Sequence, residues 1–268
     1  MATEANPGAA RNGSQLHSSV AYRVVTLLEL LSSRGNGVGV REAARETGID
    51  RSAVSRLLAQ LEQLGWVEQV ADRGVYATGP RLFSVAAAVR AHDSLWNAAR
   101  PILNRVVARH NETGYLAVRQ GDRVVYREKV ECTQPIRYVL ELGSAFPLAT
   151  GAAGRAILSA LGPEDMDRVL AEGLKAYTEQ SITSEDEYRQ QLRRDRELGY
   201  TVSLGGWVKN GGGIAAPFFD SAGNCAGALT LSAPADRLTP DVIPDIGRTM
   251  RDAGRELSRR LGYDGEWK

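Results

Sequence analysis

The sequence predicts an α+β chain in which a helix joins two domains, and three observations lead to this prediction. Apolar residues recur with helical spacing over residues 20–64 and are followed by two short β-like runs. An Ala-rich helical stretch then covers residues 80–110. Beyond it, β-like and helical runs mix up to about residue 261. The length of 268 residues is sufficient for two domains of modest size.

Three helices and a β-hairpin are predicted before residue 80. The helices cover residues 20–31, 40–47 and 51–64, and the strands cover residues 66–70 and 75–78. Ser18 or Ser19 can cap the first helix and Asp50 the third, because such side chains accept hydrogen bonds from first-turn amides. Gly48 ends the second helix in the manner of a C-terminal glycine cap.

The second part of the chain is predicted to combine helices and strands. Residues 80–92 are interpreted as a linker helix and residues 95–110 as the first helix of a second domain, since Pro101 should kink the run or start a new helix. Strands are expected at residues 115–120, 123–130, 136–142, 199–204, 213–219 and 225–232, and helices at residues 150–161, 185–198 and 240–261. The last helix should begin at Pro240, because Thr239 followed by proline is typical of a helix start.

Composition and charge exclude several classes of protein. A hydrophobic content of 43% excludes global disorder, and a net charge of +1 means that any nucleic-acid partner must be argued from local placement. Two cysteines without a CxxC spacing indicate a reducing compartment. No apolar run reaches the ~18 residues of a membrane helix. Residues 1–17 lack the apolar run of a secretory signal, so we expect a disordered arm and a soluble, cytoplasmic protein without a membrane partner.

Residues arranged for catalysis or metal binding are not found in the sequence. The three histidines, His17, His92 and His110, do not have the spacing of metal ligands. There is no pair of carboxylates, no nucleophile–base pair and no phosphate-binding glycine loop. We therefore expect no catalytic residues, no metal site and no cofactor, and a protein that is not an enzyme.

Residues 40–78 have the order of a winged helix-turn-helix, in which the second helix enters the major groove of DNA. The apolar stripe of that helix consists of Val54, Leu57, Leu58 and Leu61. The opposite stripe consists of Ser52, Ser55, Arg56 and Ala59, and Arg51 joins it at the N-terminus. Arginine side chains can donate paired hydrogen bonds to guanine edges or phosphates. Serine hydroxyls and the first-turn amides of a helix can donate hydrogen bonds to phosphates.

The predicted DNA-binding residues are thus Arg51, Ser52, Ser55, Arg56 and, as a wing contact in the hairpin turn, Arg73. The alternative interpretation is a helical hairpin with solvated arginines, because residues 1–80 contain as many acidic residues as arginines.

The segment TGIDRSAVSRLLAQLEQLGWVEQVADRGVYATGPRLFSVA resembles the DNA-binding domain and linker of IclR-type transcriptional regulators. The runs GSAFPLATGAAGRAIL, RELGYTVS and GIAAPFFDSAGNCAGALTLSAP follow in that family's order, so the resemblance covers about residues 18–262. It implies a winged helix-turn-helix over residues 18–79, a linker helix over residues 80–94 and a GAF-like α/β effector domain over residues 95–263. It also implies homodimers, often dimers of dimers, on palindromic operators. Ala53 stands where the family usually has a threonine, which removes one phosphate contact.

The resemblance further implies an effector pocket under a curved sheet. The matching positions are Gly151, Ala152, Ala153, Ser203, Gly213, Thr230 and Ser232. Two departures stand out: SLGGW replaces an acid-rich segment of many members, and Gly213 replaces a cysteine of some. These changes should enlarge the pocket or change its polarity, with Trp207 as a stacking wall. We expect an organic acid or aromatic metabolite other than glyoxylate or pyruvate.

The predicted function is that of a DNA-binding transcriptional regulator, more often a repressor, which a small metabolite controls. Two alternatives stay open at this stage. One is a redox-sensing regulator that uses Cys132. Cys132 is predicted to lie in a loop and Cys225 on a strand, so Cys132 is the better candidate for an exposed thiolate. The other is an enzyme or small-molecule-binding protein without DNA-binding activity.

Overall fold

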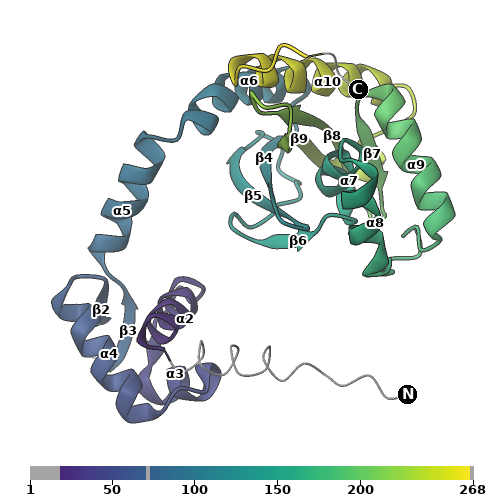
Figure 1. The fold of residues 1–268 in the computed structure, drawn as a ribbon. Coiled ribbons are helices and arrows are strands. Elements are labelled where there is room, and N and C mark those ends of the chain that lie inside the picture. The colour runs from purple at the N-terminus through teal and green to yellow at the C-terminus, as the bar shows by residue number, and fades with distance from the viewer. Residues whose placement is uncertain (1–18, 71–72, 266–268) are drawn as a thin grey trace, which may run out of the picture. The chain divides into compact units, whose positions relative to one another are not determined.

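The computed structural model describes residues 19–70 and 73–265. The chain divides into two compact units, Met1–His92 and Asp93–Lys268, which are drawn in Figure 1. The arm predicted over residues 1–17 lies outside the described residues. Among the residues that are described, no helix is both long enough and apolar enough to span a membrane.

The first unit combines helices with a small antiparallel sheet. Its helices are α2 (Val20–Ser32), α3 (Val40–Thr47), α4 (Arg51–Gln63) and α5 (Pro80–Ala91), and its strands are β1 (Val38–Gly39), β2 (Val67–Val70) and β3 (Val75–Thr78). The sheet is 3-stranded with the order β1-β3-β2. The sequence predicted the helices and the hairpin but not β1, which pairs Val38 with Tyr76 and is too short to show a periodic pattern.

The helix ends of this unit follow from single residues. Ser19, rather than Ser18, caps α2 and accepts a hydrogen bond from the amide of Tyr22. Gly48 follows α3 with a φ of 69°, a left-handed conformation that glycine adopts without strain. The stripe of Val54, Leu57, Leu58 and Leu61 on α4 is buried. It packs against Leu27 and Leu31 of α2 and so fixes which face of α4 is left to solvent.

The second unit is built on a 6-stranded antiparallel sheet with the order β6-β5-β4-β9-β8-β7. The strands are β4 (Thr113–Gln120), β5 (Arg123–Val130), β6 (Ala145–Pro147), β7 (Thr201–Leu204), β8 (Gly211–Phe219) and β9 (Cys225–Pro234). The helices are α6 (Ser94–His110), α7 (Gly151–Ser159), α8 (Pro163–Ala171), α9 (Glu185–Leu198) and α10 (Ile243–Arg260).

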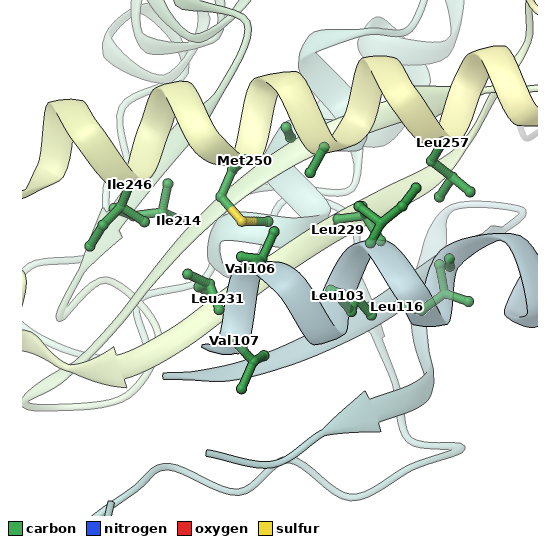
Figure 2. Close-up of a cluster of buried hydrophobic side chains, with 14 of the residues drawn as sticks. Leu103, Val106, Val107, Leu116, Ile214, Leu229, Leu231, Ile246, Met250 and Leu257 are labelled. Carbon is green, nitrogen blue, oxygen red and sulfur yellow. The ribbon is translucent and has the colours of Figure 1, made fainter. Parts of the chain in front are cut away.

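Helices cover both faces of this sheet. Figure 2 shows Met250 and Leu257 of α10 and Val106 of α6 meeting the strand residues Leu229 and Leu231 in one apolar layer. Since side chains alternate along a strand, the residues between them on β9 point to the other face, where α7 packs. This alternation places Thr230 and Ser232 on the side of α7.

Two sequence predictions for this unit are wrong, and helix α8 and strand β6 were not predicted. Residues 136–142 are irregular and not a strand, because side chains rather than a neighbouring strand bind their backbone. The last helix begins at Ile243 and not at Pro240, because the Thr239 hydroxyl bonds to Asp241 in a preceding turn. Helix α8 is short and was missed, although proline at its start and acidic residues in its first turn are typical signals.

The break before α6 lies at Asp93, whose carboxylate accepts a hydrogen bond from the amide of Trp96. Pro101 lies inside α6 and does not start a helix of its own. The sequence therefore placed the break between α5 and α6 at nearly the correct position. The Asp93 carboxylate that caps α6 marks this break, and Pro101 does not.

Candidate functional site

Helix α4 presents a basic surface to solvent. Arg51, Ser52, Ser55 and Arg56 are all exposed on the face opposite the buried stripe, as the spacing predicted. Arg73 is exposed in the turn before β3. Within residues 19–70 and 73–265, none of these three arginines forms an ion pair, whereas Arg34 of the same unit pairs with Glu46 at 3.0 Å. Their guanidinium groups are therefore free to bind an external anion.

The first turn of α4 has the Asp50 cap that the sequence predicted, so its amides are not free for phosphate as the sequence also suggested. The carboxylate of Asp50 accepts hydrogen bonds from the amides of Ser52 and Ala53 at 2.9 Å and 3.2 Å and from the Ser52 hydroxyl at 2.5 Å. The Ser52 hydroxyl and these amides lower the pKa of Asp50 from its ordinary value of 3.8. Because the carboxylate already occupies these donors, the arginines and the exposed Ser55 hydroxyl are the groups left to contact DNA.

The second unit contains a small cavity of ≈ 50 Å³ between α7 and the sheet. All the predicted effector residues except Ala153 line it. The lining consists of Tyr126, Tyr138, Leu140, Gly151, Ala152, Ser203, Trp207, Val208, Gly211, Gly212, Gly213, Thr230 and Ser232. Ala153 of α7 is fully buried in the apolar core instead. The aromatic residues Tyr126 and Tyr138 were not predicted, and Tyr138 lies in the segment that was misassigned as a strand.

Strand register explains how residues distant in sequence come together in this cavity. Ser203 of β7 pairs with Gly213 of β8, and Gly213 pairs in turn with Ser232 of β9. The three residues therefore form one row across the sheet. The Gly211–Gly213 run forms the start of β8, which begins two residues before the strand predicted from Gly213.

The cavity is narrow, in contrast to the enlarged pocket considered from the sequence. A side chain at Gly213 would lie 3.2 Å from the Cβ atom of Ala152, so the missing side chain lets α7 approach the sheet rather than leaving space. The Trp207 ring covers Gly151, where an added Cβ would lie 3.2 Å from it. Trp207 also meets Phe146 edge-on with ring centroids 4.6 Å apart. Trp207 therefore lines the cavity, as expected from the sequence, and its ring also occupies part of the cavity volume.

Two features make this cavity suitable for a polar ligand with an apolar body. The N-cap residue of α7, Thr150, makes no side-chain cap, and the first turn of α7 contains no acidic residue. The first-turn amides of a helix lack partners within the helix and carry partial positive charge, which favours an anion. The Oγ1 atom of Thr230 is buried without a hydrogen-bond partner in the described structure. Burial raises the pKa of Tyr126, so its phenol stays protonated and uncharged.

Two family models match the chain. The model described as the bacterial transcriptional regulator IclR C-terminal domain matches residues 86–259, and the IclR helix-turn-helix domain matches residues 20–71. The chain belongs to the IclR family. It is a ligand-responsive DNA-binding transcriptional regulator, and the family and the α+β fold class predicted from its sequence are confirmed.

Relatives resemble this IclR-family protein over nearly its whole length. The HTH-type transcriptional repressor AllR of Escherichia coli strain K12 is 30% identical over 257 residues, which are 96% of this chain and 95% of AllR. The IclR regulator from Alicyclobacillus acidocaldarius has a TM-score of 0.80 and 28% identity, over 90% of this chain and 98% of that one. An IclR homologue from Microbacterium hydrocarbonoxydans, complexed with 4-hydroxybenzoate, shares the fold with a TM-score of 0.79 and 23% identity, over 91% and 99% of the two chains.

The redox alternative loses its physical basis in this IclR-family structure. Cys132 lies in a loop, but its side chain is buried, and its Sγ atom accepts a hydrogen bond from the Thr113 hydroxyl at 3.3 Å. Burial raises the pKa of Cys225 to about 12. A sensor cysteine needs an accessible thiolate, which neither residue offers.

Proposed function

We propose that this regulator represses transcription by binding a palindromic operator through residues 18–79, as a homodimer or a dimer of dimers. Arg51 and Arg56 of α4 contact the major groove, Ser55 contacts phosphate, and Arg73 contacts the backbone from the wing. The observation that supports this is the absence of carboxylate partners for these arginines in the described part of the chain. Unpaired guanidinium groups on one helix face suit guanine edges and phosphates.

Operator binding is tested by a mobility shift on DNA from the upstream region of the protein's own gene, measured across salt concentrations. Arg56→Ala should weaken operator binding by about tenfold or more and reduce the preference for the operator over unrelated DNA. Arg34→Ala is the matched control, because Arg34 is an exposed arginine of the same unit that Glu46 already neutralises. Equal affinity of wild type and Arg56→Ala would contradict the proposed docking.

We further propose that residues 95–263 bind the effector and that it is a small organic acid with an aromatic or apolar body. Its carboxylate accepts hydrogen bonds from the first-turn amides of α7 and from the Thr230 hydroxyl. Its body packs against Tyr126, Tyr138 and Trp207. The unpartnered Thr230 hydroxyl in the cavity wall carries this proposal, since a buried polar group without a partner is costly in the empty protein. The 4-hydroxybenzoate of the Microbacterium homologue has the same chemistry.

The effector proposal is tested by measuring which carboxylates release the protein from operator DNA. Thr230→Val keeps the shape of the side chain and removes the hydroxyl, so the effective acid should lose about tenfold in potency. Thr201→Val is the matched control, because the Thr201 hydroxyl is also buried without a partner but does not line the cavity. An acid that acts with equal potency on wild type and Thr230→Val would contradict the assigned site.

A further inference from the structure

A second cavity of the effector unit lies beside the first and is more polar. Its volume is ≈ 270 Å³, and its walls come from α7, α9, β7 and the segment between α8 and α9. Gly151 and Ser203 line both cavities and separate them. The two cavities otherwise have different linings, so a ligand in the second one is held by groups that the proposed effector does not touch.

Tyr188 of α9 lines this cavity and carries an unused hydrogen-bonding group. The side chain is 4% exposed, and its hydroxyl is buried without a hydrogen-bond partner in the described structure. Burial raises the pKa of this phenol, so the group stays protonated and can donate. Buried hydroxyls in folded proteins nearly always have a partner, which a ligand in the cavity would supply.

The charges around the second cavity favour an anion. Arg155 and Lys175 are its charged lining residues, and no carboxylate of the described chain lines it. Asp195 lies behind Arg155, where it accepts bonds from the Arg155 Nε atom at 2.7 Å and from Gln191 at 2.9 Å. Asp195 therefore neutralises Arg155 from outside the cavity. Lys175 is exposed at the mouth and has no ion-pair partner among the described residues, so its charge is left for a ligand.

We propose that this second cavity binds a small hydroxycarboxylate anion, whose carboxylate meets Lys175 and whose hydroxyl or carboxylate oxygen accepts a hydrogen bond from Tyr188. Gln180 and Ser181 in the same wall supply further polar contacts for the ligand hydroxyls. The linings of the two sites share only Gly151 and Ser203, so the contacts to Lys175 and Tyr188 are specific to the second site.

The site is tested by calorimetric titration of the full chain with glycolate, L-malate and citrate up to about 10 mM, with malamide as an uncharged analogue of malate. At least one acid should bind and malamide should not. Lys175→Gln and Tyr188→Phe should each weaken binding of that acid by about tenfold, because each removes one contact to a charged ligand. Tyr188→Phe keeps the buried ring and removes only an unpartnered hydroxyl, so this variant stays folded.

Two matched variants locate the binding event. Lys209→Gln removes another exposed lysine, and Thr230→Val alters the first cavity alone; neither should change the affinity for the acid. Absence of binding by all three acids, or equal weakening in Lys209→Gln, would overturn the proposal. Weakening by Thr230→Val with none by Tyr188→Phe would also overturn it, by placing the acid in the first cavity. Operator release by the effector is measured separately, so that proposal succeeds or fails independently.

Discussion

The buried ion pair between Arg155 and Asp195 gives the sharpest test of how the effector unit is held together. The two side chains are 9% and 1% exposed, and the Nε and Oδ2 atoms are 2.7 Å apart. The pair ties α7 to α9, and the Arg155 guanidinium also bonds to the backbone oxygen of Val202 in β7. Asp195→Asn keeps the size of the side chain and an oxygen for Gln191, but leaves the guanidinium charge buried without its counter-charge.

Removing one partner of a buried ion pair costs about 3–5 kcal/mol of unfolding free energy. In a domain of this size the melting temperature changes by about 2–4 °C per kcal/mol, so Asp195→Asn should lower the melting temperature of the second unit by roughly 6–20 °C. Scanning calorimetry of the full chain measures this. Asp167→Asn is the matched control: Asp167 is 62% exposed and pairs with Arg189 at 2.7 Å, so its loss should cost about 1 kcal/mol or less.

The double variant Arg155→Met/Asp195→Leu removes both charges, and it should recover most of the stability that the single variant loses. The reasoning is refuted if Asp195→Asn costs no more than Asp167→Asn, because the buried guanidinium would then need no counter-charge. It is also refuted if the double variant is less stable than Asp195→Asn, since packing rather than charge would then account for the loss.

Three further predictions concern single residues. The Asp50 cap should stabilise the first unit fully above about pH 4, and this stabilisation should be lost as the pH falls through the lowered pKa of Asp50. Acid unfolding followed by circular dichroism should therefore depend less on pH in Asp50→Asn than in the wild type; identical acid-unfolding profiles would show that the cap does not cause the pH dependence. Tyr115→Phe should increase the hydrogen-exchange rate of the Leu140 amide about fivefold, because the Tyr115 hydroxyl accepts a hydrogen bond from this amide at 3.0 Å. An unchanged exchange rate would show that another group holds residues 136–142 in place. In the native chain, Cys132 should react with a thiol reagent about a hundredfold more slowly than after unfolding, as its burial requires; equal rates would restore the redox alternative.

The helix-turn-helix unit was predictable because its signals are local. Ser19, Gly48 and Asp50 act on residues within a few positions along the chain, and the stripe of α4 repeats with the helical period. The exposed face of α4 follows directly from the buried one. The sequence assigned the first-turn amides of α4 both to the Asp50 cap and to phosphate, and the structure shows that the cap holds two of them. A cap and a phosphate compete for the same amides, and the sequence alone does not show which one holds them.

The effector unit was harder to predict because its decisive contacts are non-local. Residues 136–142 alternate like a strand, yet the Tyr115 hydroxyl bonds to the Tyr138 oxygen and the Leu140 amide and holds them as an irregular segment. The cavity residues of β7, β8 and β9 were placed through the resemblance to the IclR family, and Tyr126 and Tyr138 were missed. The domain boundaries at residues 17, 79, 94 and 263 stay predictions.

The size of the first cavity sets a condition on how the regulator responds to its effector. A volume of ≈ 50 Å³ accommodates a few water molecules and not an aromatic acid, so the acid proposed for this cavity has to displace lining side chains. The Trp207 ring, which covers Gly151, is the side chain we expect to move. That ring follows Gly205 and Gly206, whose carbonyl oxygens accept hydrogen bonds from Thr178 at 2.6 Å and from Ser181 at 2.8 Å. These two bonds hold the segment that carries the Trp207 ring. Since a ligand shifts an equilibrium only by its differential affinity for two states, we expect the cost of moving this segment to be subtracted from the affinity for the proposed acid.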